Sequence, residues 1–265
     1  MLTSTAIGTG GLGRFGNQCY TIAGVIGIAE KSGQPFSFPH WKNYDNALFG
    51  GEVTDFEDYF ENPLPRMNGE VFNEYGYFWG YRDIVLNGNW SINAHLQSPK
   101  YFEHCIDKVR HYFRMKHEPK DVKGVCVHYR GGDYIDDENA YHPRCSKEYY
   151  EKAMAMFPGE KFYVLTDDPE AARKVFSGMP HDITIMADLM ERDDRLKYEE
   201  PFYLADFAFM KNCKNFIISN STFSSFAATI AEHPEKKVVA PKRWFGTQAG
   251  DMNWNDGYDK NWIVI

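Results

Sequence analysis

The sequence predicts an α/β protein with parallel sheets. In its second half, short apolar runs such as GVCVHYR, KFYVLT and NFIIS alternate with segments of helical periodicity such as SKEYYEKAMAMF and TFSSFAATIAEH. The first residues likewise combine a strand pattern, a glycine-rich turn and an apolar helix pattern. Strands that alternate with helices form parallel sheets covered on both faces, with ligands at the carboxyl ends of the strands. A binding site is therefore expected among residues that directly follow strands.

The pattern of the first 115 residues predicts fewer helices and strands than that of the second half of the chain. Residues 40–95 are rich in Asn, Gly, Pro and aromatic residues with weak periodicity, so we expect short helices and loops there. Ser98 and Pro99 precede apolar residues at helical spacing, which predicts a helix that ends near Met115. The other expected elements are a strand over 2–8, a helix over 16–31 and a strand over 34–39.

A charged segment broken by proline, KHEPKDVK at 116–123, predicts the domain boundary. It divides the chain into domains of residues 1–118 and 119–265. In the second domain, strands are expected over 124–130, 161–166, 182–186, 215–219 and, last, 236–241. Helices are expected between them, over 146–157, 169–177, 200–213 and 222–233.

Composition narrows the function classes. The formal net charge of −8 disfavours a nucleic acid as partner, because binding a phosphate backbone needs a surplus of Lys and Arg. The five cysteines include no C-x-x-C pair, so neither a disulfide framework nor a zinc knuckle is indicated and a reducing compartment is expected. The longest apolar run is far shorter than the ~20 residues of a membrane helix, and no signal-peptide pattern opens the chain. We expect a cytoplasmic protein without a transmembrane segment, with peripheral membrane contact left open.

The glycine-rich turn matches a dinucleotide fingerprint only weakly. Residues 8–13 satisfy G-x-G-x-x-G between a strand and a helix, but no acidic residue closes the second strand, so NAD is disfavoured. The turn continues with Arg14, Phe15, Gly16, Asn17 and Gln18, which place a cation and two amides at a helix N-terminus, an arrangement suited to an anion or a sugar hydroxyl. The alternative is a structural glycine turn with a capping Asn.

The run VCVHYRGGDYI carries a stronger signal. A buried strand brings His128 and Arg130 to its carboxyl end, where two glycines let the backbone approach a ligand and Asp133 can orient the guanidinium. The planar fork of an arginine suits a diphosphate because it binds two oxygens at once and stays charged. The alternative is a structural Arg–Asp ion pair.

Three further carboxylates are candidates, and two of them lie at the same predicted sheet edge. In VLTDDPE a buried strand ends before Asp167 and Asp168, and helix capping accounts for only one of them. Asp206 falls within an apolar helix pattern, where a carboxylate is disfavoured unless it meets a pair of donors. Guanine offers such a pair, and a local Lys or an exposed helix face is the alternative.

The segment FIISNSTFSSFAA places five polar side chains around a strand-to-helix turn, where backbone N–H groups and the helix dipole favour phosphate oxygens. One such residue would be a cap, but five exceed what capping needs. The five are Asn220, Ser221, Thr222, Ser224 and Ser225.

These motifs together resemble the fucosyltransferase superfamily, and most closely glycosyltransferase family 11, the α-1,2-fucosyltransferases. The resemblance rests on GGLGRFGNQ, HYRGGDY, YVLTDDPE and CKNFIISNSTFSSFAA with VVAPKRWF, while GNWSINAHLQSPKYF fits the family pattern imperfectly. The resemblance implies a GT-B fold, in which two Rossmann-like domains with parallel sheets face a cleft. Residues 1–118 would form the acceptor side and residues 119–265 the GDP-sugar-binding domain.

The resemblance also implies an activity. The expected enzyme moves L-fucose from GDP-β-L-fucose to a hydroxyl of a glycan acceptor, such as the 2-OH of a galactoside. It inverts the configuration at the sugar carbon and needs no metal and no cofactor. Arg130 would hold the β-phosphate, His128 would face the guanosine and Asp206 would pair with guanine. The remaining implied donor-binding residues are Arg14, Gly16, Asn17, Asp133, Asp167, Asp168, Ser221, Thr222, Ser224 and Ser225.

The chain departs from the family pattern at two places. The second arginine of the family's H-x-R-R motif is Gly131 here, which affects donor affinity or donor identity. Two family tryptophans are replaced by Ser225 and Phe226, which affects the acceptor side.

The catalytic base is expected in the acidic loop DYIDDEN. Glu138 is the predicted base because in one branch of the superfamily a glutamate at that distance after the arginine motif serves. The rivals are Asp136, Asp137 and His142, and the alternatives are a loose displacement with late deprotonation or an exposed loop without a role.

Several other functions fit the same residues. One is a metal-dependent transferase in which Asp167 and Asp168 bind a nucleotide-bound Mg²⁺ or Mn²⁺. Others are an enzyme like the protein O-fucosyltransferases, another GDP-sugar transferase, or a non-catalytic protein that binds sugar nucleotides.

Overall fold

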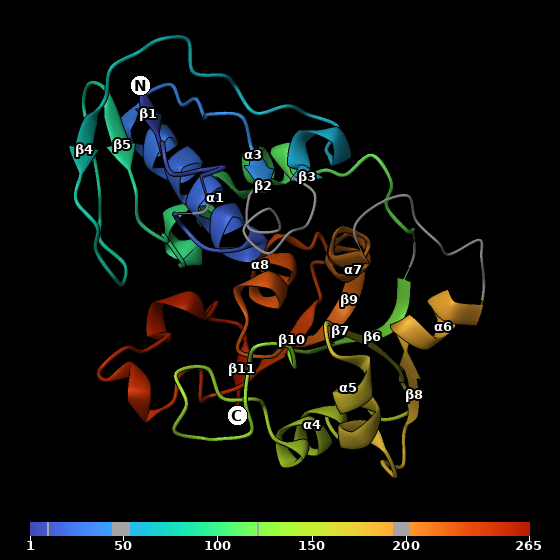
Figure 1. Cartoon of the computed structure of the whole chain (residues 1–265). Helices are drawn as coiled ribbons and strands as arrows, with labels where there is room; N and C mark the ends of the chain where they lie inside the picture. Colours follow the sequence, from blue (N-terminus) through green and yellow to red (C-terminus); the bar gives the residue numbers. More distant parts are fainter. Residues whose placement is uncertain (10, 44–53, 121, 193–201) are drawn as a thin grey trace. The chain divides into compact units, whose positions relative to one another are not determined.

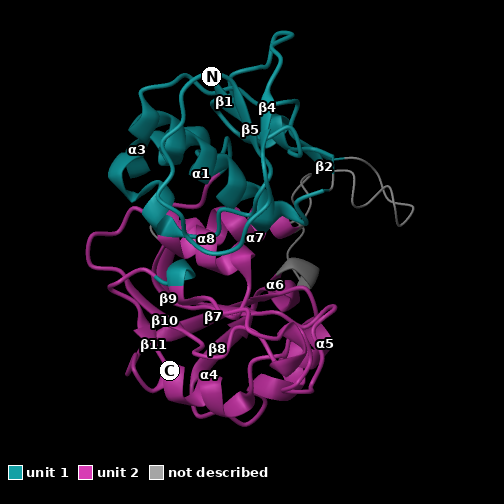
Figure 2. Ribbon diagram, turned by 90° about the vertical axis from the view of Figure 1, so that its left-hand side faces the viewer, with its two compact units in different colours: residues 1–117, 256–258 teal, residues 118–255, 259–265 magenta. Residues whose placement is uncertain are grey.

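The computed structural model describes residues 1–265 except 10, 44–53, 121 and 193–201. The chain divides into two compact units, one of residues 1–117 with 256–258 and one of 118–255 with 259–265 (Figure 2). Asp256 ties the short C-terminal segment into the first unit: its carboxylate accepts from Lys100 Nζ at 2.7 Å and from the Tyr81 N–H at 3.0 Å. The first unit therefore contains residues that the predicted boundary at 118 assigns to the second domain.

The N-terminal unit is built around helix α1. Nearly all of its residues from 15 to 29 are buried, and it ends at Gly33, whose left-handed backbone (φ 62°) favours glycine. A three-stranded parallel sheet, in the order β1-β5-β4, lies beside it (Figure 1). The elements are β1 (Leu2–Thr3), α1 (Phe15–Ser32), β2 (Lys42–Asn43), β3 (Thr54–Asp55), η1 (Phe56–Tyr59), β4 (Asn73–Tyr75), β5 (Trp90–Ile92), η2 (Pro99–Tyr101), η3 (Glu103–Cys105) and α3 (Ile106–Tyr112).

Two strand predictions in this unit were wrong in extent, and two short strands were not predicted. The first strand ends at Thr3, because the hydroxyls of Ser4 and Thr5 turn to bond Asn93 and Ser91. The segment 34–39 forms only single bridges, while β4 and β5 were not predicted because each has only three residues.

The helix predicted over 98–115 is also broken. Phe102 (φ −134°, ψ 1°) and Cys105 (φ −131°, ψ 33°) leave helical geometry, so two 3₁₀ turns precede the short α3. Phe102 is fully buried, and its ring lies 6.1 Å from that of Tyr20 on α1. Packing against α1 thus overrides the helical periodicity of this segment.

The C-terminal unit contains a six-stranded, wholly parallel sheet, which confirms the predicted α/β class (Figure 1). Its order is β11-β10-β9-β6-β7-β8. The chain adds β7 and β8 on one side of β6 and then crosses to the other side, where it adds β9, β10 and β11. The strands are β6 (Val122–Tyr129), β7 (Lys161–Thr166), β8 (Asp182–Ile185), β9 (Cys213–Ile217), β10 (Lys237–Ala240) and the unpredicted two-residue β11 (Ile263–Val264).

Helices cover both faces of this sheet (Figure 2). On one face, alternate β6 residues Val125, Val127 and Tyr129 join a core with side chains of α4 and α5. On the other face, the His128 ring lies 5.6 Å from Phe223 of α8, and Phe207 of α7 stacks on Phe226 at 6.3 Å. The helices are α4 (Lys147–Met154), α5 (Pro169–Phe176), α6 (Met186–Arg192), α7 (Phe202–Lys211) and α8 (Thr222–Ile230), with 3₁₀ turns η5 (Thr247–Ala249) and η6 (Asn255–Gly257).

The strand order reverses between β6 and β9. In open α/β sheets, ligands bind outside the carboxyl ends of the strands at such a reversal. The sheet topology therefore predicts a ligand site at the residues that follow β6 and β9.

In the part of the chain that the structure describes, no helix combines the length and the apolar character needed to cross a bilayer.

Candidate active site

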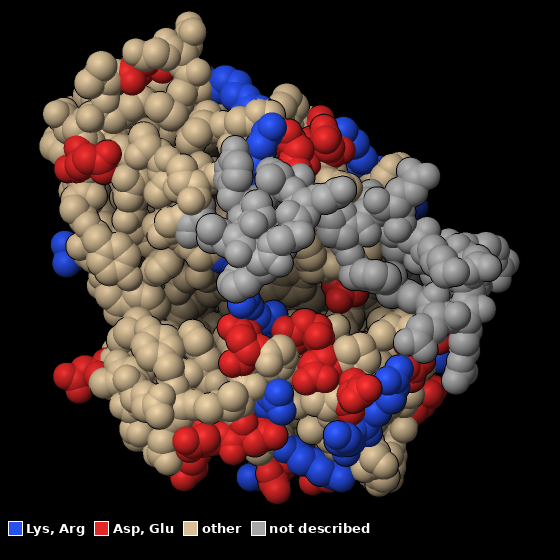
Figure 3. Space-filling model, viewed as in Figure 1, with Lys and Arg blue, Asp and Glu red and all other residues tan. Residues whose placement is uncertain are grey.

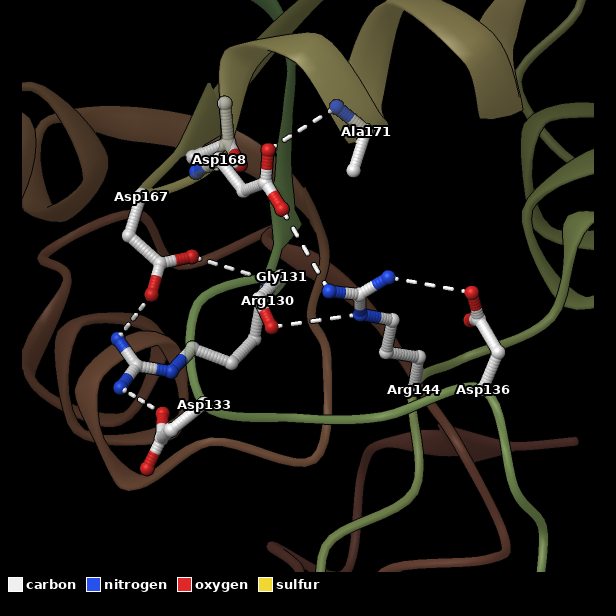
Figure 4. Close-up of polar contacts among 9 residues, drawn as sticks. Arg130, Gly131, Asp133, Asp136, Arg144, Asp167, Asp168 and Ala171 are labelled. Carbon is white, nitrogen blue, oxygen red and sulfur yellow. Dashed lines mark hydrogen bonds and ion pairs between the residues drawn. The ribbon is translucent and has the colours of Figure 1, made fainter.

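Arg130 is the first residue after β6 and lies at the centre of the sheet's carboxyl edge. Its Nη2 donates to Asp133 Oδ1 at 2.6 Å, and its Nη1 lies 2.6 Å from Asp167 Oδ2 (Figure 4). The Arg130 side chain is 19% exposed. Two carboxylates from different loops therefore hold a guanidinium in one orientation while leaving part of it accessible.

Two glycines after Arg130 allow the turn to approach the two aspartates. A Cβ atom at Gly131 would lie 2.9 Å from Asp168 Oδ2 and closer still to Asp168 Cβ. A Cβ atom at Gly132 would lie 3.2 Å from Asp167 Cγ, with a carboxylate oxygen closer. The Gly131 N–H donates to Asp167 Oδ1 at 2.9 Å. Any side chain at these two positions would have to displace an aspartate.

Both aspartates after β7 have partners for both oxygens. Asp167 accepts from the Gly131 N–H and pairs with Arg130. Asp168 caps α5 through the Ala171 N–H at 3.0 Å and lies 3.5 Å from Arg144 Nη2. A divalent cation would have to displace an arginine from each carboxylate, so this donor set does not fit a resident metal. Among the described residues, no group of three or more His, Cys, Asp or Glu side chains could hold one.

A buried hydrogen bond joins the ends of β6 and β9. His128 Nδ1 lies 2.7 Å from the hydroxyl oxygen of Ser219, and both residues are buried. Burial, and then the positive charge of Arg130, lower the pKa of His128 to about 3. The imidazole is therefore neutral at physiological pH and bridges the two strands at the point of reversal.

Asp206 is a half-buried carboxyl on α7. Burial raises its pKa to about 7, and the negative charge of Asp167 contributes in the same direction. The carboxyl is thus close to half-protonated at neutral pH, and a ligand with two adjacent N–H donors would favour its ionised form.

The polar side chains of the serine-rich turn differ in burial, and none of them is exposed. Ser221 is the N-cap of α8 but makes no side-chain capping bond, and Thr222 is half-buried. Ser224 and Ser225 are fully buried, and the Ser224 hydroxyl donates to the Ser221 carbonyl at 3.2 Å. Ser221 and Thr222 are therefore the hydroxyls of this turn that lie nearer to solvent.

Asn220, which the sequence also suggested for phosphate binding, holds loops together. Its Nδ2 donates to the backbone carbonyls of Pro143 and Trp244, both at 2.9 Å. The backbone carbonyl of Asn220 accepts from the Tyr134 hydroxyl at 3.0 Å. These buried bonds give Asn220 a structural role.

Glu138 lies on the exposed loop after Asp133. Its carboxylate is 70% exposed and lies 2.6 Å from Arg243 Nη1. Of its rivals, Asp136 lies 3.1 Å from Arg144 Nη1, and the His142 ring stacks on Tyr134 at 4.9 Å. The role of Glu138 as base stays a prediction.

The three predicted site residues of the N-terminal unit share the first turn of α1. Arg14 is its N-cap, Gly16 lies in the first turn, and Asn17 Oδ1 accepts from Gln97 Nε2 at 2.9 Å. Gly13 before them has a positive φ of 76°, whereas Gly10 of the glycine pattern lies outside the described residues.

Arg144 and Ser219 belong to this constellation, although the sequence did not single them out. Arg144 lies in an irregular loop without a motif, and only the return of that loop to Gly131 reveals its partners. On the face in view, acidic and basic side chains intermingle over the C-terminal unit (Figure 3). Arg130 and Arg144 each lie between two aspartates, Asp133 and Asp167 for Arg130 and Asp136 and Asp168 for Arg144.

Comparison with known proteins places the chain in a family. The model of glycosyl transferase family 11 matches residues 77–265, more than two thirds of the chain. The O-antigen biosynthesis glycosyltransferase WbnK of Escherichia coli is 32% identical over 132 residues, 48% of this chain and 40% of that protein. An alpha-1,2-colitosyltransferase of Escherichia coli is 27% identical over 197 residues, 68% of this chain and 64% of that protein. The chain thus matches less than two thirds of the length of either relative.

Two solved structures are also similar. NodZ alpha-1,6-fucosyltransferase soaked with GDP-fucose aligns with a TM-score of 0.47 and 14% identity, covering 87% of this chain and 92% of that chain. POFUT1 in complex with GDP-fucose aligns with a TM-score of 0.46 and 13% identity, covering 100% and 97%. The family match spans the arginine motif, the paired aspartates and the serine-rich turn, and it confirms the resemblance: the chain belongs to glycosyl transferase family 11.

Proposed function

We propose that this chain is an inverting, metal-independent fucosyltransferase that moves L-fucose from GDP-β-L-fucose to a hydroxyl of a glycan acceptor, the 2-OH of a galactoside. The observation that carries the proposal is the guanidinium of Arg130, which Asp133 and Asp167 orient where the strand order reverses. Arginine binds diphosphate oxygens through its planar fork, and the chain's family transfers glycosyl groups. All five cysteines are free, which supports a reducing, cytoplasmic compartment.

In this proposal the unit of residues 118–255 and 259–265 binds the donor. Arg130 contacts the β-phosphate, and Ser221, Thr222 and the N-terminus of α8 contact the remaining phosphate oxygens. Neutral His128 faces the guanosine, and the Asp206 carboxylate accepts from the two adjacent donors of guanine. The burial of Ser224 and Ser225 favours a contribution from their backbone over one from their hydroxyls.

The chemistry follows from the charge that develops on the leaving group. The acceptor oxygen attacks the anomeric carbon on the face opposite to GDP, and the bond to the β-phosphate oxygen breaks. Arg130 is already oriented by its two carboxylates, so it can stabilise the new negative charge with little reorganisation. Removing one such preorganised group commonly lowers the rate by ~100-fold or more. Glu138 is the proposed base for the acceptor proton.

The N-terminal unit has the acceptor role in this proposal. Arg14, Gly16 and Asn17 meet at the first turn of α1, and the positive end of a helix dipole favours an anion or a sugar hydroxyl. They would contact the diphosphate or the transferred sugar.

The experiment compares Arg130→Ala with Arg173→Ala. Arg173 is the matched control because it also pairs with an aspartate, Asp188, but lies on α5 outside the candidate site. GDP release from GDP-fucose is measured over a panel of galactoside acceptors, together with calorimetric binding of GDP and UDP. We expect a preference for GDP, parent activity in Arg173→Ala and a loss of at least ~100-fold in Arg130→Ala. Parent activity in Arg130→Ala would overturn the phosphate assignment, and GDP binding without turnover over the panel would favour a non-catalytic protein.

A second candidate donor carries colitose, because one relative is named an alpha-1,2-colitosyltransferase. A colitosyl donor linked to GDP would use the same diphosphate and guanine contacts and differ only at the sugar. Competition between GDP-fucose and a colitosyl nucleotide in the same GDP-release assay decides which sugar is transferred faster.

A further inference from the structure

In the turn that follows Arg130, residue 131 has no room for the side chain of a second arginine. Asp168 occupies the space that a Cβ atom of residue 131 would need, with Asp168 Oδ2 at 2.9 Å and Cγ at 3.0 Å from the Cβ position. Asp168 is held there by its capping bond to the Ala171 N–H. Gly131 is thus required by the packing of this loop, and any second guanidinium must come from another part of the chain.

Arg144 brings a guanidinium to that place from the loop before α4. Its Nε donates to the Gly131 carbonyl at 3.3 Å, and its Nη2 lies 3.5 Å from Asp168 Oδ2 (Figure 4). Its Nη1 donates to Asp136 Oδ2 at 3.1 Å, and the side chain is 20% exposed. Arg144 therefore binds both the backbone of residue 131 and the carboxylate that excludes a side chain there.

We propose that Arg144 is a positioning residue for Arg130, at the place where the family's motif has a second arginine. Arg144 holds the Gly131 carbonyl, and the N–H of the same residue bonds Asp167 Oδ1 at 2.9 Å. Asp167 in turn orients the Arg130 guanidinium through its other oxygen at 2.6 Å. Gly131 thus connects the two arginines. Its carbonyl accepts from Arg144, and its N–H bonds the Asp167 carboxylate that contacts Arg130. The inference rests on the proposed function, in which Arg130 binds the β-phosphate of the donor.

This chain of contacts predicts that the two arginines act as one unit. Removing Arg144 releases the Gly131 peptide and lets Asp167 and Arg130 rotate away from the orientation that the diphosphate needs. The loss should appear only when Arg130 is present and only for a ligand that has a β-phosphate.

The test is a double-mutant cycle read by calorimetry with GDP and with GMP. The proteins are the parent chain, Arg144→Gln, Arg130→Ala, the double variant, and Arg173→Gln as the matched surface control. We expect Arg144→Gln to weaken GDP binding about tenfold, the effect of losing a hydrogen bond to a charged group, and to leave GMP binding unchanged. The double variant should bind GDP no more weakly than Arg130→Ala, and Arg173→Gln should match the parent.

Three results would overturn the inference: unchanged GDP affinity in Arg144→Gln, an equal loss for GDP and GMP, or a loss that adds fully to that of Arg130→Ala. Urea unfolding reports independently whether each variant is folded. If Arg144→Gln does not fold, Arg144→Lys, which keeps the charge but cannot bond all three partners, takes its place in the same cycle. A parent chain that binds neither GDP nor GMP would overturn the proposed function itself, so the two failures are distinguishable.

Discussion

His128 Nδ1 lies 2.7 Å from the hydroxyl oxygen of Ser219, so a single buried hydrogen bond joins the ends of β6 and β9. These are the two strands between which the order of the sheet reverses. Arg130 follows one partner by two residues, and the N-cap of α8, Ser221, follows the other by two. The bond therefore adds to the pairing of β6 with β9 at the point where the two loops that the proposed function assigns to the diphosphate begin.

Removing the Ser219 hydroxyl should loosen this connection. Ser219→Ala leaves a buried ring nitrogen without its partner, which commonly costs about 1–3 kcal/mol of unfolding free energy. We expect a decrease of that size in urea unfolding, together with weaker GDP binding. Ser177→Ala, at the end of α5, is the control for the loss of a serine outside the site. Unchanged stability and affinity in Ser219→Ala would show that the bond contributes nothing to either.

The pH dependence of stability tests the neutral state of His128. Its folded pKa of about 3 lies below the ordinary value of 6.5, so the folded state binds fewer protons than the unfolded state between these values. The contribution is present above pH 6.5 and is lost as the pH falls toward 3. His128→Asn, which keeps a polar group but does not titrate, should lose less unfolding free energy between pH 7.5 and pH 5 than the parent. Parallel curves for the two proteins would contradict the neutral assignment.

Asp206 should act in the opposite direction. Its folded pKa of about 7 lies above the ordinary value of 3.8, so this contribution to stability is present below pH 3.8 and is lost as the pH rises through 7. Asp206→Asn should therefore be more stable than the parent at pH 8, with a smaller difference at pH 5, in urea unfolding at both values. The same variant should bind GDP less tightly, because an amide offers one acceptor where the carboxylate offers two. A variant less stable than the parent at pH 8 would contradict the buried, destabilised carboxylate.

Restoring the family's second arginine should harm this chain. In Gly131→Arg the new Cβ atom meets Asp168, and such overpacking typically costs about 1–3 kcal/mol. Gly131→Ala introduces the same Cβ atom without the charge, so both variants should lose unfolding free energy and GDP affinity. The comparison of the two by calorimetry separates the steric effect from the charge. Parent or tighter GDP binding in Gly131→Arg would show that Asp168 yields to a second guanidinium.

The sequence predicted the elements whose pattern is decided locally. β7 matches its predicted run KFYVLT over Lys161–Thr166, because a buried parallel strand is nearly continuous in apolar residues. The helix predicted over 98–115 failed because burial of Phe102 against α1 is a tertiary effect that periodicity does not contain. β11 has two residues, too few for a period.

The candidate site shows the same division. Arg130 and Asp167 were predicted because each follows a buried strand, and parallel strands bring their carboxyl ends to one edge. Arg144 was not predicted, because its loop has no repeating pattern and its partners are distant in sequence. Ser219 needed the strand order, which places β9 beside β6.

The paired aspartates predict how the protein responds to chelation. Asp167 and Asp168 direct all four carboxylate oxygens at arginines or backbone N–H groups, so a metal would have to break these bonds before it could bind. We expect GDP affinity and GDP release from GDP-fucose to be the same with EDTA as with added Mg²⁺ or Mn²⁺. Asp168→Asn keeps an oxygen for the Ala171 N–H, whereas Asp168→Ala removes the cap of α5 and should cost about 1 kcal/mol of unfolding free energy. Activity that disappears on chelation and returns with Mn²⁺ would instead assign these carboxylates to a nucleotide-bound cation, and Arg130 would then share the diphosphate with that ion.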